Sequence, residues 1–302
     1  MKLEPLVTII TPSYNQSKYL EETINSVINQ DYSNIEYIII DGGSSDNSVE
    51  LIKKYETKLA YWVSEPDKGQ ADAINKGFLK ASGDFICWIN SDDILYPDFI
   101  SRRIKEFEQN PNIDMIYGDV DQGPILGKTR LRKGENTSYT QMLKTLLIPI
   151  PQQSAIWRRR VLEKTGVMDP KLHVLLDRDY FIRISKNHNI LYVPGALAFF
   201  RIHQNSKSIK EAISWAEELP VYYESLIEKW ADYKNQRHLV MAKCYWYCSN
   251  ICSENNDKIK AREFLRKAKK ESPVTFLKLV FIQFLVKVKQ HLRYSGILSN
   301  KK

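Results

Sequence analysis

Residues 85–93 read FICWINSDD, an apolar run that ends in two adjacent carboxylates. The apolar residues predict a buried β-strand over 85–89, and the polar residues predict a turn at 90–93. Hard divalent cations prefer oxygen ligands, and a metal that bridges two phosphates needs only one or two protein carboxylates. The alternative is that one of these aspartates caps a helix beginning near Pro97. The stretch therefore predicts a strand that delivers either metal ligands or a helix cap.

The same strand-and-turn unit occurs three more times upstream. Strands are predicted over 6–12, 35–40 and 59–63, each followed by a helix, over 17–30, 44–55 and 70–81. Strands that alternate with helices of this length predict parallel βαβ units, with helices on both faces of the sheet. Ligands of such sheets bind beyond the carboxyl ends of the strands. Polar turns stand at each of these ends, at 11–16, 41–46, 64–68 and 90–93.

The pattern changes along the rest of the chain. A strand is predicted over 114–118, an irregular polar stretch to about 139, a helix over 177–186, and strands over 190–193 and 196–201. From about residue 211 the pattern is helical. We therefore expect an α/β domain over 1–210 and a helical region over 211–302. Three cysteines spaced four apart, Cys244, Cys248 and Cys252, share a helix face and are interpreted as reduced packing residues rather than metal ligands.

Charge is distributed unevenly between the two parts. The chain of 302 residues carries a net charge of +8, yet residues 1–204 have 25 basic and 26 acidic side chains. The excess lies in 205–302, with 19 basic and 10 acidic side chains. No nucleic-acid-binding motif is evident, so we expect no nucleic acid partner and favour an anionic membrane surface or an acidic partner. The first residues lack the pattern of a secretory signal, which predicts a cytoplasmic location.

Two other turns are candidates for nucleotide binding. Thr11, Pro12 and Tyr14 offer main-chain groups and an aromatic ring to a base, or else form an ordinary strand-to-helix loop. Asp41 precedes two glycines and could accept hydrogen bonds from a base or ribose, or else stabilise a structural turn.

Four segments together resemble a known family. TIITPSYN at 8–15, IDGGSSDNS at 40–48, SEPDKGQADAINKG at 64–77 and WINSDD at 88–93, in this order, are similar to the nucleotide-sugar-binding half of the family 2 glycosyltransferases, which have the GT-A fold. The resemblance continues through PQQSAIWRRRVLEKTGVMDPKL, LLDRDYFIRIS and FRIHQNSKS. It covers roughly residues 5–210 and does not extend over the helical region.

The resemblance implies roles for individual residues. Thr11, Pro12 and Tyr14 match the uridine-side loop, Asp41 the acidic contact to the base, and Asp67 a further donor-pocket position. The family's metal motif reads Asp-x-Asp. Asp92 falls on the metal-binding position of this motif, with Asp93 beside it. Asn90 replaces the first acid and keeps a side-chain oxygen that can contact ribose. Ser91, between Asn90 and Asp92, falls in the donor site.

The remaining implied roles concern the reaction itself. His203 falls near the diphosphate or metal, with a structural histidine as the alternative. Asp177 falls on the position of the catalytic base, although Leu176 replaces the Glu that usually precedes it. Asp179 is therefore a second candidate for the base, and a helix cap is an alternative role for Asp177. Inverting transfer requires a base that takes the acceptor proton and an electrophile, Mn²⁺ or Mg²⁺, on the leaving diphosphate. Gln153 and Trp157 either support the acceptor side or belong to the core.

The predicted function is transfer of a single sugar from a nucleotide-sugar donor, UDP-linked by preference, to a hydroxyl of a glycan or lipid-linked acceptor in surface polysaccharide synthesis. The Gln-x-x-Arg-Trp motif of processive synthases does not occur, which favours single addition. Two alternatives are a non-catalytic nucleotide-sugar-binding protein and a nucleotidyltransferase on a related α/β sheet. The first would be expected to lack the carboxylates at 92 and 177, and the second to carry a glycine-rich basic loop after its first strand.

The C-terminal helix predicted over 274–294 has an apolar stripe with basic residues beside it. Its longest uncharged run, 279–286, is too short to span a bilayer, which requires roughly 20 residues. An amphipathic helix of this kind predicts peripheral binding to the inner face of the cell membrane. The alternative is that the stripe packs on the helices at 222–272. Residues 240–273 also resemble a helix-hairpin repeat, which suggests an interaction module. The apolar stripe comprises Val274, Leu277, Phe281, Phe284, Leu285, Val288 and Leu292.

Overall fold

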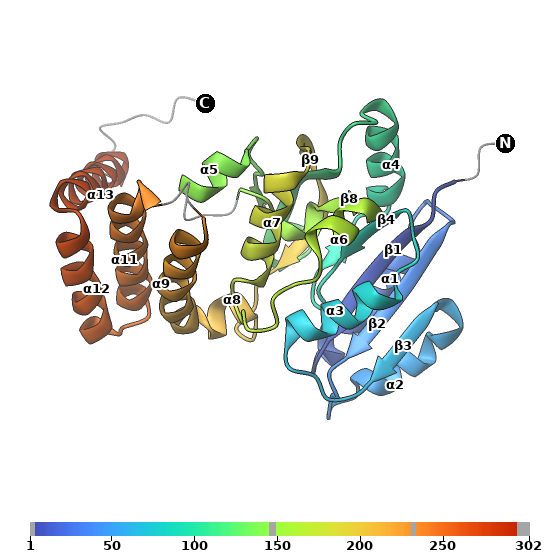
Figure 1. Ribbon diagram of the computed structural model, residues 1–302. Coiled ribbons are helices and arrows are strands. Elements are labelled where there is room, and N and C mark those ends of the chain that lie inside the picture. The colour runs from blue at the N-terminus through green and yellow to red at the C-terminus, as the bar shows by residue number, and fades with distance from the viewer. Residues whose placement is uncertain (1–3, 145–148, 231–233, 295–302) are drawn as a thin grey trace. The chain divides into compact units, whose positions relative to one another are not determined.

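The computed structural model describes residues 4–144, 149–230 and 234–294, and the chain divides into two compact units, Met1–Ile209 and Lys210–Lys302. The first unit is an α/β structure (Figure 1). Its strands are β1 (Val7–Ser13), β2 (Ile35–Asp41), β3 (Tyr61–Ser64), β4 (Phe85–Trp88), β5 (Ile94–Leu95), β6 (Met115–Ile125), β7 (Lys128–Arg132), β8 (Ile156–Arg158) and β9 (Ile190–Arg201). Its α-helices are α1 (Ser17–Ile28), α2 (Ser48–Lys54), α3 (Gln70–Lys80), α4 (Phe99–Gln109), α5 (Tyr139–Lys144), α6 (Arg159–Thr165) and α7 (Leu176–Asn187), followed by α8 (Lys207–Lys210) at the unit boundary. Two short 3₁₀ helices are η1 (Glu56–Lys58) and η2 (Gln152–Ser154).

The strands form one nine-stranded sheet in the order β3-β2-β1-β4-β8-β6-β9-β5, with β7 paired to β6. The pairs β3–β2, β2–β1 and β1–β4 are parallel, as the alternating pattern predicts. Strand β8 then runs antiparallel to both β4 and β6, and β6 pairs parallel with β9. The carboxyl ends of β1, β2, β3 and β4 therefore lie along one edge, where the polar turns are found.

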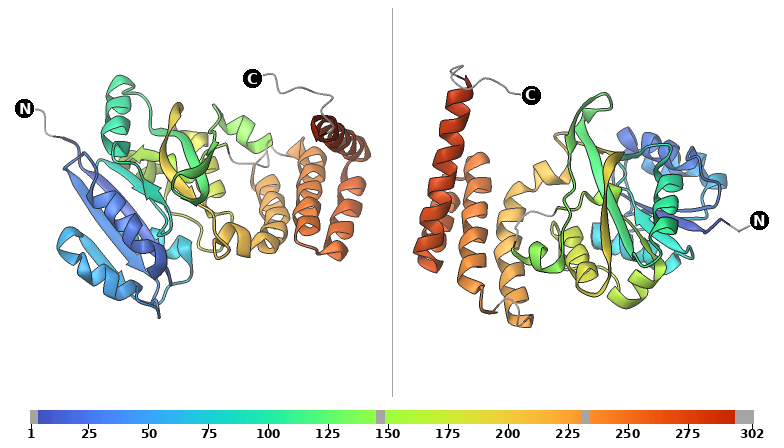
Figure 2. Two further views of the ribbon diagram at one scale, coloured as in Figure 1. Left: turned by 180° about the vertical axis from the view of Figure 1, so that it is seen from behind. Right: turned by 90° about the horizontal axis from the view of Figure 1, so that it is seen from above.

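Helices cover both faces of the sheet (Figure 2). Val7 and Ile9 of β1 pack into a core cluster with residues of α1, α2 and α4. Ile10 points to the opposite face, where a Cβ at Gly77 of α3 would lie 2.5 Å from Ile10 Cγ2. Gly77 thus allows α3 to approach the sheet closely. This side also holds an aromatic cluster in which the Trp88 and Trp157 ring centroids are 5.4 Å apart.

The second unit is helical. Its described helices are α9 (Ala212–Lys229), α11 (Arg237–Glu254), α12 (Lys258–Glu271) and α13 (Pro273–Tyr294). Helix α11 packs against α9 and α12, and Cys244, Cys248 and Cys252 are free and buried on it, as predicted. Helix α13 contacts α11 and α12, yet Leu277 and Phe281 of the predicted stripe are 65% and 61% exposed. The stripe residues from Phe284 onward lie outside the described side chains. Among the residues described, no helix combines the length and apolarity needed to cross a membrane.

Two sequence expectations about the sheet are wrong. The stretch after residue 118, expected to be irregular, is a β-hairpin in which β6 continues to Ile125 and returns as β7. The two strands expected over 190–193 and 196–201 form the single strand β9, although its pairing with β6 shifts register on either side of Asp119. Gly195, which has a φ of +125°, lies between the two expected strands and made the pattern look interrupted.

Candidate active site

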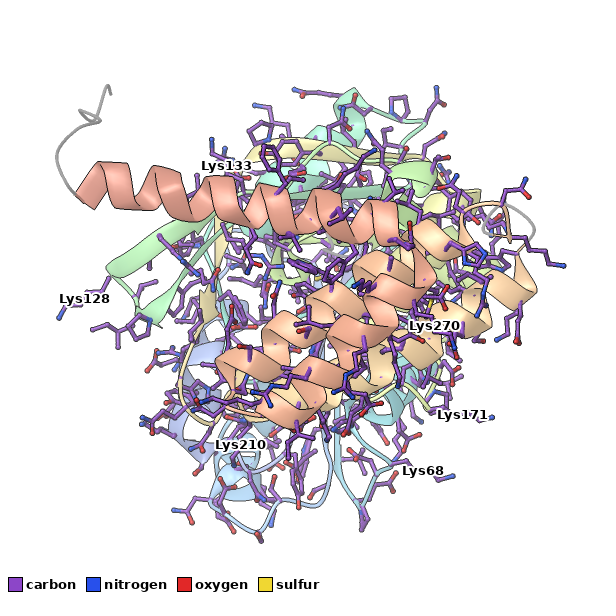
Figure 3. The ribbon with its side chains drawn as sticks, turned by 90° about the vertical axis from the view of Figure 1, so that its left-hand side faces the viewer. Lys68, Lys128, Lys133, Lys171, Lys210 and Lys270 are labelled. Carbon is purple, nitrogen blue, oxygen red and sulfur yellow. The ribbon has the colours of Figure 1, made fainter. Side chains whose placement is uncertain are left out.

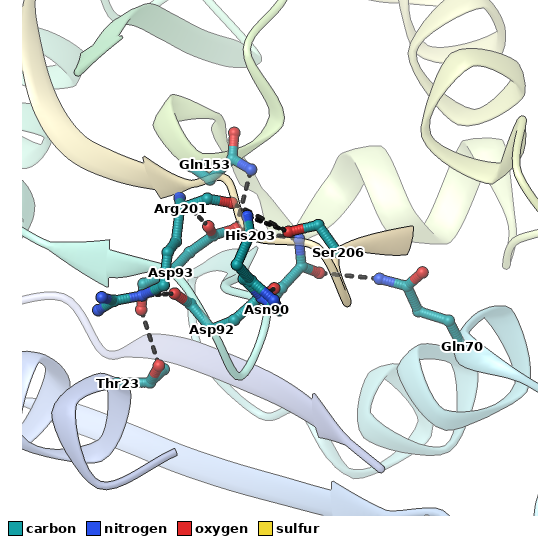
Figure 4. Close-up of polar contacts among 9 residues, drawn as sticks. All are labelled: Thr23, Gln70, Asn90, Asp92, Asp93, Gln153, Arg201, His203 and Ser206. Atoms are coloured by element: carbon teal, nitrogen blue, oxygen red, sulfur yellow. Dashed lines mark hydrogen bonds and ion pairs between the residues drawn. The ribbon is translucent and has the colours of Figure 1, made fainter. Parts of the chain in front are cut away.

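The turn after β4 places the two adjacent aspartates in opposite surroundings. Asp93 N donates to Asn90 O at 3.0 Å and closes the predicted turn. The Asp93 side chain is wholly buried, and its carboxylate accepts hydrogen bonds from Gln153 Nε2 (2.8 Å), Arg201 N (2.9 Å) and Asn90 Nδ2 (3.1 Å). Figure 4 shows these donors around Asp93. A carboxylate committed to three protein donors favours a structural role for Asp93 over the metal-ligand role expected from the sequence.

Asn90 is held by other amide side chains. Its Oδ1 accepts from Gln70 Nε2 at 2.9 Å, and its Nδ2 also donates to Gln152 Oε1 at 3.2 Å. Gln152 in turn donates to Trp88 O at 2.8 Å. The Asn90 amide therefore fixes the turn in place, and Ser91 beside it is 5% exposed.

Asp92 faces the other way and meets His203, which follows β9. Asp92 Oδ2 and His203 Nε2 are 3.1 Å apart, and their side chains are 16% and 11% exposed. The Tyr19 ring lies 4.5 Å from the His203 ring, centroid to centroid. Arg201 fixes the geometry, since its Nε donates to Asp92 O at 2.8 Å and it forms an ion pair with Glu22 at 2.6 Å. Two side chains 111 residues apart in sequence thus meet at the carboxyl edge of the sheet.

Burial controls the ionisation of both aspartates. It raises the pKa of Asp92, although the hydrogen bond and charge of His203 act in the opposite direction. Burial also raises the pKa of Asp93 well above its usual value, and the negative charge of Asp92 adds to that effect. At both carboxylates the effect of burial therefore outweighs that of the surrounding hydrogen bonds and charges.

The two candidates for the base also differ in their surroundings. Asp179 Oδ2 accepts from Arg183 Nε at 2.7 Å within helix α7, an ion pair that favours a structural role for Asp179. The Asp177 carboxylate accepts from Arg178 N at 2.7 Å. Burial raises the pKa of Asp177, opposed by that hydrogen bond and by the charges of Arg132, Arg178 and Lys207. A carboxylate with a raised pKa is a better proton acceptor near neutral pH, which favours Asp177.

A polar bridge connects the surroundings of Asp177 with the turn after β4. Lys207, whose charge acts on Asp177, donates from Nζ to Gln70 Oε1 at 3.2 Å. Gln70 donates to Asn90, as described above. Lys207 and Gln70 therefore connect the turn after β4 with the neighbourhood of Asp177.

The turns after β1, β2 and β3 also come together. Asn15, in the left-handed region with a φ of +52°, accepts from Ser45 N at 2.9 Å, while Asn15 N donates to Ser44 Oγ at 2.8 Å. A Cβ at Gly42 would lie 2.5 Å from Asp67 Oδ2, so a larger residue at this position would displace the Asp67 carboxylate. The three strand ends thus form one connected surface.

Within this surface the predicted donor residues differ in exposure. Tyr14 is 61% exposed, whereas Thr11 and Pro12 are buried and Thr11 Oγ1 lies 3.1 Å from Tyr37 Oη. The buried Asp41 carboxylate accepts from Ser44 N (2.8 Å), Ser44 Oγ (2.6 Å), Ser64 Oγ (2.8 Å) and Gly43 N (3.2 Å). That carboxylate is committed to its own turns, which favours the structural alternative for Asp41 over a contact to the base.

Several site residues were missed in the sequence. Gln70, Arg201 and Lys207 carry the hydrogen bonds that connect the site, but their types alone give no signal of that role. Gln153, by contrast, was singled out, and it holds Asp93. Trp157 is fully buried in the aromatic cluster, so it belongs to the core.

The described part of the chain contains no group of three or more His, Cys, Asp or Glu side chains arranged to hold a metal ion. A metal bound to a diphosphate needs fewer protein ligands, because phosphate oxygens and water complete its coordination. Asp92 and His203 offer one carboxylate and one imidazole, side by side and partly exposed. This pair fits a metal of that kind, and manganese accepts both ligand types.

The chain is similar in sequence to known proteins. The family model described as glycosyl transferase family 2 matches residues 8–166. An uncharacterized glycosyltransferase of Mycobacterium tuberculosis is 31% identical over 185 residues, which are 61% of this chain and 70% of the relative. An uncharacterized glycosyltransferase of Rickettsia typhi is 25% identical over 256 residues, covering 82% of this chain and 79% of the relative.

Solved structures share the fold. Residues 1–349 of TarS from S. aureus align with a TM-score of 0.57 and 15% identity, over 86% of this chain and 90% of TarS 1–349. The mannosyltransferase PcManGT from Pyrobaculum calidifontis, in complex with GDP-Man and Mn²⁺, aligns with a TM-score of 0.62 and 16% identity, over 97% of this chain and 83% of its own. The α/β GT-A fold predicted from the sequence, followed by a helical region, is confirmed.

Proposed function

The chain belongs to glycosyl transferase family 2, and from that premise we propose that it transfers a single sugar from a nucleotide-sugar donor to a hydroxyl group, with inversion and with the help of a divalent metal. The observation that carries this proposal is the contact between Asp92 and His203 at the carboxyl edge of the sheet. Two ligand-type side chains from distant strand ends converge there, beside the ring of Tyr19. Their position beside the connected turns of β1 to β4 suits a ligand that carries a diphosphate.

The donor is proposed to be UDP-linked. The exposed Tyr14 ring is available to a base, and Asp67 lies against Gly42 in the adjoining turn. Among the similar structures, TarS 1–349 was solved in complex with UDP and with UDP-GlcNAc, whereas PcManGT was solved with GDP-Man. These complexes support a nucleotide-sugar donor for this chain, and the preference for uridine rests on the resemblance of its first loop.

Asp92 and His203 would hold Mn²⁺ or Mg²⁺ on the donor diphosphate. When bound, such an ion supplies Lewis-acid stabilisation of the leaving phosphate charge. Asp93 acts on this site only through position, because its three hydrogen bonds hold the turn that carries Asp92. Arg201 fixes the same turn from the side of β9.

Asp177 is proposed as the base. Its carboxylate accepts the proton of the acceptor hydroxyl while that oxygen attacks the anomeric carbon from the face opposite the leaving diphosphate, which inverts the configuration. Lys207, which bridges to Gln70, holds positive charge close enough to Asp177 to act on its pKa. That charge partly offsets the effect of burial, which raises the pKa of Asp177.

The acceptor is proposed to be a glycan or lipid-linked glycan in surface polysaccharide synthesis, reached from the inner face of the cell membrane. Support comes from α13, whose described stripe residues Val274, Leu277 and Phe281 are each more than half exposed. An apolar helix face on a unit rich in Lys and Arg is suited to an anionic lipid surface.

The proposed reaction is tested by nucleotide release from a panel of UDP- and GDP-sugars, with Mn²⁺ or with chelator. We expect metal-dependent release from at least one donor, and its loss in Asp92→Ala. Glu50→Gln, at an exposed carboxylate on α2, is the control and should behave as wild type. Full activity of Asp92→Ala in chelator would contradict the metal assignment, and no turnover or binding of any nucleotide sugar would contradict the function.

A further inference from the structure

The hairpin formed by β6 and β7 projects from the sheet of the first unit, Met1–Ile209, which is called the catalytic unit below. In the described chain β7 pairs with β6 alone, and two residues, Leu126 and Gly127, connect them. Gly127 has a φ of +86°, and no heavy atom lies within 4 Å of the position that a Cβ would take there. Figure 3 shows Lys128 at the far end of this ribbon, pointing away from the rest of the unit. The tip is therefore convex and surrounded by open space.

The surface of the hairpin combines apolar and basic side chains. Ile125, Leu126 and Leu131 are 49%, 53% and 49% exposed, although each is a large apolar residue. Residues 122–134 contain four basic side chains and no acidic one. Lys128, Arg130 and Arg132 alternate along β7 and so share one face of the ribbon. The basic residues of this segment are Lys128, Arg130, Arg132 and Lys133.

The base of the hairpin is joined to the candidate active site. Gly123 O of β6 accepts from Ile202 N at 2.8 Å, directly before His203. Arg132 lies over the Phe200 ring, 5.8 Å from its centroid, and its charge lowers the pKa of Asp177 against the effect of burial. At roughly 3.3 Å per residue, the tip at Leu126 lies about 10 Å along the ribbon from Gly123. Whatever the tip contacts is thus held a short distance from the reaction.

We propose that the hairpin tip, residues 124–131, docks the catalytic unit on an anionic lipid bilayer. Ile125 and Leu126 enter the interfacial region, while Lys128 and Arg130 lie among the lipid headgroups. A convex tip cannot enclose a small acceptor, but it can enter a soft surface, and its charge is complementary to anionic lipid. The contact brings the Asp177 side of the site to the surface where a lipid-linked hydroxyl is presented. This contact is separate from the one proposed for α13.

Vesicle binding tests the proposal without any need for the reaction. The full chain is sedimented with phosphatidylcholine vesicles that contain or lack phosphatidylglycerol, and the partition coefficient is measured. Each basic residue near an anionic surface contributes about a fivefold factor, so Lys128→Gln/Arg130→Gln should lower partition about 30-fold on the anionic vesicles and little on the neutral ones. Ile125→Ser/Leu126→Ser should lower it on the anionic vesicles as well.

Matched variants separate the hairpin from other contributions. Lys53→Gln/Lys58→Gln removes two exposed charges elsewhere on the same unit and should leave partition within about twofold of wild type. Each double variant of the hairpin is also combined with Leu277→Ser/Phe281→Ser, so that membrane binding through α13 does not mask a loss of binding through the hairpin.

Three results would overturn the docking proposal. The first is that both double variants of the hairpin bind vesicles as well as the chains from which they were made, with α13 intact and with α13 substituted. An equal loss in the Lys53→Gln/Lys58→Gln control would do so, because binding would then follow net charge alone. So would a hairpin-dependent dimer, seen by sedimentation velocity, with vesicle binding unchanged, since the tip would then contact a second copy of the chain. Donor turnover in solution is measured in parallel and reports on the proposed reaction independently.

Discussion

Replacing Asp177 by Asn should separate catalysis from stability. The amide keeps an oxygen that can accept from Arg178 N, so the start of α7 is preserved. What the variant loses is the proton acceptor. A general base contributes about 10² to 10⁴-fold, which corresponds to roughly 3 to 5 kcal/mol of transition-state stabilisation. We therefore expect transfer to fall by that factor while the affinity for donor is unchanged.

The same substitution should not destabilise the fold at neutral pH. Burial raises the pKa of Asp177, so the folded chain binds this proton more tightly than the unfolded chain. Wild type consequently loses stability as pH rises through the folded-state pKa, and Asn at this position removes that loss. The variant should be at least as stable as wild type at pH 7, and its advantage should disappear below the pKa of an unfolded aspartate. A residue whose removal maintains stability and abolishes transfer acts in the reaction.

The assay compares three chains. Acceptor-dependent nucleotide release gives the rate, calorimetric titration with nucleotide gives donor affinity, and thermal unfolding between acid and neutral pH gives stability. Asp179→Asn is the matched control, because it removes a carboxylate two residues away that is paired with Arg183. It should lose stability and keep most of its rate. A crippled Asp179→Asn beside a nearly normal Asp177→Asn would refute the assignment.

Two further predictions concern the metal pair and the core. His203→Ala should raise the Mn²⁺ concentration needed for donor binding at least about tenfold, since it removes one of two proposed ligands and weakens the affinity for the ion. A Mn²⁺ titration measures this, and an unchanged midpoint would exclude His203 as a ligand. Trp157→Ala should lower the free energy of unfolding, measured with urea, by about 3 to 5 kcal/mol, because the side chain is fully buried in the aromatic cluster. A decrease below about 1 kcal/mol would contradict its placement in the core.

The first half of the fold could be predicted because its signals are local. Strands β1, β2 and β4 are rich in apolar residues and buried over most of their length, as strands covered on both faces are, and each is followed by a polar turn. The edge of the sheet where these turns meet follows from the parallel pairing alone.

The hairpin was missed for a physical reason. From Pro124 to Leu131 every side chain is exposed, so no buried face imposes an alternation of apolar and polar residues. Its backbone is held by pairing with β6, a contact that leaves no pattern in the sequence.

The adjacent aspartates show where sequence reasoning ends. Asp92 and Asp93 are the same residue type in the same turn, and their carboxylate oxygens made both of them candidate metal ligands in the sequence. The backbone turn directs one toward His203 and the other into the interior. The interior one is tolerated only because Gln153, Asn90 and a main-chain N–H all donate to it. An Asp at position 90 would replace the Asn90 donor 3.1 Å from Asp93 with a second acceptor, so the neutral amide there is consistent with a buried carboxylate that orients the turn and leaves Asp92 to face the ligand.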